Sequence, residues 1–85
     1  MTLEQVKLIA VTYQDTTLGM VLGKRYTLNG QLPDNDHALA HAKWMCEEIA
    51  LMDNPGKAMR WLCFVQGVLW MTGRRTIDEM RDDNR

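Results

Sequence analysis

Apolar residues recur at helical spacing along most of the chain, and the residues between these stretches are ones that begin or end helices. The first stretch opens with Thr2 and Gln5 in capping-box spacing, which predicts a helix from Leu3 to about Tyr13. Its run LIAVTY also suits a strand, because branched and aromatic side chains favour strands. The positions on its apolar face are Leu3, Val6, Ile9, Ala10 and Tyr13.

A second helix is predicted from about Thr17 to Leu28, with Asp15 or Thr16 as its cap. The pair Asn29-Gly30 would end it, since glycine adopts the left-handed conformation that closes helices. The run YTLNGQL is also compatible with a hairpin, because Asn-Gly is the preferred two-residue hairpin turn. So short a hairpin is barely stable alone, which favours the helix, but the two alternatives stay open here.

The sequence pattern predicts three more helices in the second half of the chain. Asp34 or Asp36 caps the first, which ends at DNPG. Asn54 caps the next, with Pro55 at its first position, and this helix continues to about Thr72. The last helix starts with a capping box from Thr76 to Glu79 and turns Ile77 and Met80 toward the core. The apolar face of the first of these three helices consists of Ala38, Ala42, Met45, Ile49 and Met52.

Length and composition bound the fold. A chain of 85 residues supports one domain, and 46% hydrophobic with 25% charged residues is typical of a folded globular protein. We therefore expect an all-α fold, a small bundle of four to five short helices that forms a single helical domain over residues 1–85.

The segment RWLCFVQGVLWM is apolar on nearly every side, more than a bundle helix requires. Its core face accounts for Ala58, Trp61, Leu62, Val65, Val68 and Leu69. The opposite side carries Met59, Cys63 and Trp70 on one flank and Phe64 and Met71 on the other, divided by Arg60 and Gly67. Because exposed apolar patches mark interfaces, we predict a partner-binding surface formed by Met59, Arg60, Cys63, Gln66, Trp70 and Arg74.

The charge balance disfavours nucleic acid as a partner. Ten basic and eleven acidic residues give a net charge of -1, whereas proteins that hold phosphate backbones carry a basic excess. The longest apolar run is too short for a membrane span. Cys46 and Cys63 lie in apolar runs with no leader segment before them, so we expect two buried thiols in a reducing cytoplasm, with a disulfide as the alternative.

Candidate chemistry is sparse. His37 and His41 have the spacing of two metal ligands on one helix, but HALAH lacks the glutamate of a zinc protease motif and no third ligand follows from the spacing. The chain contains no serine, and the apolar neighbours of both cysteines disfavour a reactive thiolate. We expect exposed helix histidines, no metal or other cofactor, and no enzymatic activity.

The segment KAMRWLCFVQGVLWMTGRRTIDEMRDDN, preceded by HAKWMCEEI, resembles the C-terminal part of short uncharacterised accessory proteins of tailed phages and prophages of enteric bacteria. The shared pattern is a tryptophan-bearing FVQGVLW helix followed by TIDEMR, and it includes no catalytic residues. Such proteins commonly bind a host enzyme, nuclease or defence complex. The resemblance therefore implies a host partner, bound in the host cytoplasm and inhibited or modulated.

Two other functions remain open at this stage. The apolar surface could be the seam of a homodimer that acts as a structural or interaction module, or His37 and His41 could belong to a metal-binding enzyme. A homodimer would be stable at micromolar concentrations, and a metal enzyme would be purified with bound zinc.

Overall fold

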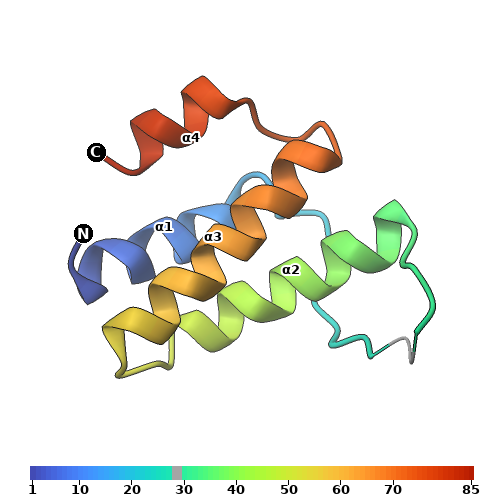
Figure 1. Ribbon diagram of the computed structural model, residues 1–85, viewed down its shortest axis with the longest axis horizontal. Helices are drawn as coiled ribbons and strands as arrows, with labels where there is room; N and C mark the ends of the chain where they lie inside the picture. Colours follow the sequence, from blue (N-terminus) through green and yellow to red (C-terminus); the bar gives the residue numbers. More distant parts are fainter. Residues whose placement is uncertain (28–29) are drawn as a thin grey trace.

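The computed structural model describes residues 1–27 and 30–85, and these residues form four helices and no strand. The helices are α1 (Leu3–Asp15), α2 (Asn35–Ile49), α3 (Pro55–Met71) and α4 (Ile77–Asp83). The first three pack on one another, with α3 crossing in front of α1 and α2 in Figure 1, while α4 folds back over the α1 side. The predicted all-α bundle is confirmed.

Each helix begins at a side-chain cap that the sequence predicted. Thr2 and Thr76 both form complete capping boxes, at α1 and α4. Asp34 accepts a hydrogen bond from the backbone N–H of His37, and Asn54 accepts one from that of Lys57. Because a lost cap typically costs about 1 kcal/mol, these contacts fix where the helices start.

One core lies between the first three helices. It contains thirteen buried residues: Val6, Ala10 and Tyr13 of α1, Leu18 of the following turn, Leu39, Ala42, Met45, Cys46 and Ile49 of α2, and Ala58, Leu62, Val65 and Leu69 of α3. The predicted apolar faces of α1, α2 and α3 point into this core, with Trp61 and Val68 half-buried at its edge.

The helix predicted from Thr17 to Leu28 is wrong over the part that the structure describes. Residues 16–20 form turns and residues 22–27 have no regular structure, while its predicted end at residues 28 and 29 lies outside the described residues. The segment runs along α2 instead. The N–H of Lys24 donates to the carbonyl of Ala40 at 3.1 Å, and the N–H of Tyr26 donates to Nδ1 of His41 at 3.1 Å. These contacts replace the helical hydrogen bonds that two glycines in this stretch would weaken.

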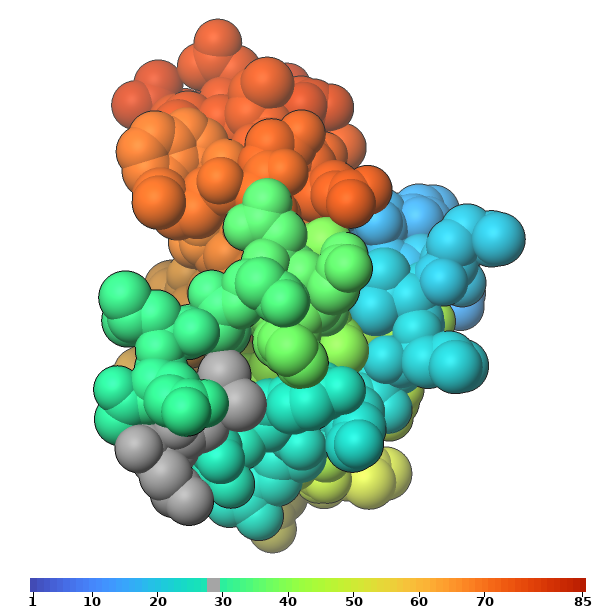
Figure 2. Space-filling view, turned by 90° about the vertical axis from the view of Figure 1, so that its right-hand side faces the viewer, coloured from blue at the N-terminus to red at the C-terminus, as the bar shows by residue number. Residues whose placement is uncertain are grey.

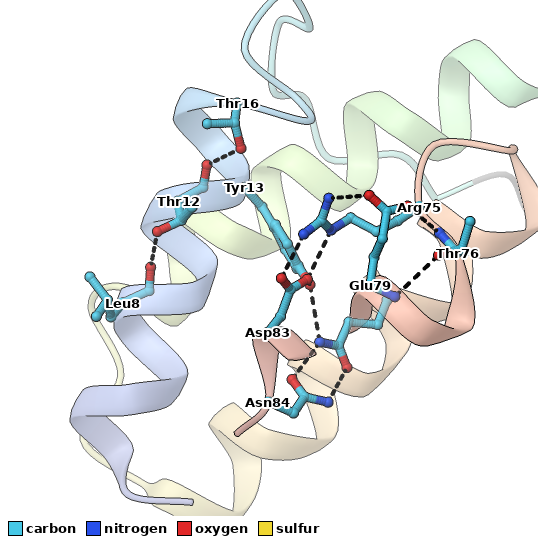
Figure 3. Close-up of polar contacts among 10 residues, drawn as sticks. Leu8, Thr12, Tyr13, Thr16, Arg75, Thr76, Glu79, Asp83 and Asn84 are labelled. Carbon is cyan, nitrogen blue, oxygen red and sulfur yellow. Dashed lines mark hydrogen bonds and ion pairs between the residues drawn. The ribbon is translucent and has the colours of Figure 1, made fainter. Parts of the chain in front are cut away.

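A buried polar network holds α4 against α1 and α3 (Figure 3). The Tyr13 hydroxyl donates to Oδ2 of Asp83 at 2.6 Å, and Arg75 pairs with the same carboxylate through Nε at 2.8 Å and Nη2 at 2.6 Å. Gln66 donates through Nε2 to the Tyr13 hydroxyl at 3.2 Å and to Oδ1 of Asn84 at 2.7 Å. Burial and the bond to Asp83 raise the pKa of Tyr13 to about 12, so its hydroxyl stays protonated.

The short helix α4 adds little apolar burial. Met80 is buried as predicted, but Ile77 is 45% exposed, so its predicted place in the core is wrong. The network around Asp83, and not an apolar stripe, therefore sets the position of α4.

Candidate protein-binding surface

One side of α3 is uncovered along most of the helix. We call it the open face; its residues lie within roughly 120° of each other around the helix axis and are Arg60, Cys63, Phe64, Gly67, Trp70 and Met71, all exposed. Phe64 is 57% exposed, Trp70 52% and Met71 74%. Trp70 and Met71 lie about two helical turns after Phe64, and the three large apolar side chains share one side of the helix, the type of surface that marks interfaces.

A groove adjoins the open face where the start of α2 meets the end of α3. It encloses about 540 Å³, and its apolar lining comes from Pro33 and Ala38 on one side and from Phe64, Trp70 and Met71 on the other. Figure 2 looks onto this end of the molecule, with the orange end of α3 lying above the green start of α2. The groove extends the apolar surface from α3 onto α2.

Gly67 lies at the middle of the open face. A Cβ atom built at this position meets nothing within 4 Å, so no neighbour within the described residues requires a glycine there. No close backbone packing is therefore formed at this glycine within the described residues. Glycine in a helix interior still costs about 1 kcal/mol relative to alanine.

The six predicted partner-binding residues do not all lie on one surface in the structure. Three lie on the open face, namely Arg60, Cys63 and Trp70, and Arg74 is exposed just beyond the end of α3. Met59 is half-buried against the core. The prediction that Gln66 points outward is wrong, because it is only 7% exposed and hydrogen-bonds to Tyr13 and Asn84.

Three residues of the open face, Phe64, Gly67 and Met71, were left out of the predicted surface. Phe64 and Met71 project onto the other flank of α3, which the predicted surface did not include. The signal that could have found them is the helical projection itself, in which the strip of Arg60 and Gly67 lies between the flanks. The two flanks and this strip form one surface.

The two cysteines differ in their surroundings. Cys46 is buried in the core as predicted, and burial raises the pKa of its thiol to about 12. Cys63 is exposed on the open face, so the prediction of a second buried thiol is wrong. Both are free, and the alternative of a disulfide between them is excluded in this structure.

Both histidines take part in contacts between α2 and the segment before it. Nδ1 of His41 accepts the N–H of Tyr26, while burial and the charge of Arg25 lower the pKa of His41. Nδ1 of His37 lies 2.9 Å from Oδ1 of Asp34, and the imidazole ring packs edge-on against the Tyr26 ring with 4.6 Å between the ring centroids. Within residues 1–27 and 30–85, no three His, Cys, Asp or Glu side chains come close enough to share a metal ion.

Comparison of the chain with protein-family models, with curated proteins and with solved structures found no match. The resemblance to phage accessory proteins therefore stays a prediction from the sequence. None of the helices in the described part of the chain has the length and apolar character that a membrane crossing requires.

Proposed function

We propose that the protein acts by binding another protein through the open face of α3, without catalysing a reaction. The observation that carries this proposal is the exposure of Phe64, Trp70 and Met71 on one continuous helix face beside an apolar groove. Tryptophan is enriched among residues that dominate binding energy, and methionine adapts its shape to a partner. Covering these side chains would remove a large apolar area from water.

The nature of the partner comes from the resemblance to phage and prophage proteins. On that basis the partner is a host protein, such as a nuclease or a component of a defence complex, which the bound protein inhibits or modulates. The helix-in-groove mode suits this surface, because an apolar helix of a partner can lie along α3 and fill the groove at the start of α2.

Affinity capture followed by measured binding tests the proposal. The tagged protein is used to capture partners from a lysate of an enteric bacterium, and each captured protein is purified and titrated calorimetrically against wild type and Trp70→Ala. A central interface tryptophan contributes about 2 kcal/mol or more, so affinity should fall at least about 20-fold.

The matched control is Leu51→Ala, which shortens an exposed apolar side chain outside the open face. It should leave the affinity unchanged, and thermal unfolding should show that both variants fold. If Trp70→Ala and Phe64→Ala retained wild-type affinity for every captured protein, the open face would not be the binding surface.

A further inference from the structure

The open face carries opposite charges at its two ends. Lys57 and Arg60 lie at the start of α3, and neither is in an ion pair within the described residues. Asp34 lines the groove at the other end, and Asp36 follows in the first turn of α2. The helix α3 itself contains no Asp or Glu. On the α2 side the apolar surface is therefore bordered by positive charge at one end and by negative charge at the other, while Arg74 lies beyond the end of α3 beside Trp70.

Lys57 and Asp34 lie along the same edge of the open face, the edge that faces α2. Lys57 places its ammonium group 5.3 Å from the ring centre of Trp61, which in turn lies 5.7 Å from Trp44 of α2. The edge that faces α2 thus carries Lys57 at one end and Asp34 at the other. Arg74 lies on the opposite edge, in the hollow lined by Ile77 and the start of α4.

From this arrangement we propose that a second copy of the chain packs antiparallel on the open face of α3, with the two-fold axis beside Gly67. A two-fold interface uses the same patch on both copies, so each end of the patch must complement the other end. An antiparallel pair brings Lys57 of one copy to Asp34 of the other, along the edge that faces α2. A parallel pair would instead place Arg60 against Arg60.

The apolar residues of the open face match under the same symmetry. Phe64 and Met71 share the α2 edge, three positions before and four after Gly67, so Phe64 of one copy meets Met71 of the other. Cys63 and Trp70 share the opposite edge and meet in the same way. At the axis the two glycines face each other, which lets the helix backbones approach closely and gives Gly67 the neighbour that it lacks within the described residues.

This pairing rests on the proposed function, since it takes the open face as a protein-binding surface and names a second copy as its occupant in the free protein. A host partner that uses the same face would compete with the second copy. The dimer and the host complex can therefore be tested separately.

Engineered cysteines test the geometry. In Gly67→Cys combined with Cys63→Ser, the new thiols lie at the two-fold axis, and mild oxidation should give a disulfide-linked dimer on a non-reducing gel. Wild type is the internal control, because two Cys63 residues would lie about 12 Å apart along the axes, beyond the roughly 7 Å between Cα atoms that a disulfide tolerates. Leu51→Cys with Cys63→Ser, an exposed site off the face, should also stay unlinked.

Sedimentation equilibrium tests the charge pairing. Wild type should dimerise at micromolar concentration, and Lys57→Glu should weaken the dimer about tenfold or more, because it sets a carboxylate against Asp34. The control Arg81→Glu makes the same charge change on the exposed side of α4 and should not alter the dimer.

A strictly monomeric wild type, or cross-linking through Cys63 but not through Gly67→Cys, would overturn the antiparallel dimer. If a monomeric wild type still lost affinity for a purified host protein on Trp70→Ala, the proposed function would stand while the second copy would be rejected as the occupant.

Discussion

Replacement of Tyr13 by phenylalanine removes one oxygen atom from the centre of the network that holds α4. Tyr13 is 2% exposed, and its hydroxyl donates to Asp83 at 2.6 Å while it accepts from Gln66 at 3.2 Å. The ring, which is part of the buried core, is unchanged by the substitution. The change in the free energy of unfolding therefore reports the two hydrogen bonds alone.

The expected loss is about 1.5 kcal/mol. A hydrogen bond to a charged group contributes about 1.5–3 kcal/mol. The lower value applies here, because Asp83 keeps both bonds from Arg75 and Gln66 keeps Asn84 as a partner. For a chain of this length, 1 kcal/mol corresponds to about 4–8 °C, so the melting temperature should fall by about 6–12 °C.

Urea and thermal unfolding of the purified protein measure this loss, with Tyr26→Phe as the control. The hydroxyl of Tyr26 makes no hydrogen bond within residues 1–27 and 30–85, so its removal should cost less than about 0.5 kcal/mol. A double-mutant cycle with Asp83→Asn should give a coupling energy of about 1 kcal/mol. A loss at Tyr13 no larger than at Tyr26, with no coupling to Asp83, would refute the role of the network.

Three further predictions follow from single residues. Under conditions that keep the chain monomeric, Gly67→Ala should raise the free energy of unfolding by about 1 kcal/mol, measured in urea, because the added methyl meets no neighbour. A thiol reagent should label one cysteine per native chain, the exposed Cys63, and both after unfolding, because Cys46 is buried. The bonds from Arg75 lower the pKa of Asp83 from its ordinary 3.8. The stabilisation from these bonds is therefore present above pH 3.8 and is lost as the pH falls through the lowered pKa. When the urea midpoint of unfolding is plotted against pH, Asp83→Asn should reduce the fall in the midpoint at acid pH.

The helix starts could be predicted because their signals are local. A cap residue and the N–H that it accepts lie three positions apart, as with Thr2 and Gln5 or Thr76 and Glu79. The segment after α1 could not be predicted in this way. Its backbone is held by Ala40 and His41, which lie fifteen or more positions further along the chain. Local propensity favoured a helix there, and contacts with α2 override it.

The candidate site was predictable in part for a similar reason. The spacing of α3 correctly separated Leu62, Val65 and Leu69 from the outward residues. It could not show which outward residue another element would cover. Gln66 is buried because Tyr13, fifty-three positions earlier, and Asn84, after α4, both hydrogen-bond to it.

The length of α4 helps to explain why no element among the described residues covers the open face. At 1.5 Å per residue, its 7 residues span about 10 Å, against about 25 Å for the 17 residues of α3. Even if α4 folded onto the outer side of α3, it could cover only part of Phe64, Trp70 and Met71. The hydrogen bond between Tyr13 and Asp83 holds α4 on the α1 side, so Phe64, Trp70 and Met71 all remain exposed. Among the described residues, α4 is therefore not long enough to bury the whole face, and we propose a second copy or a host protein as its cover.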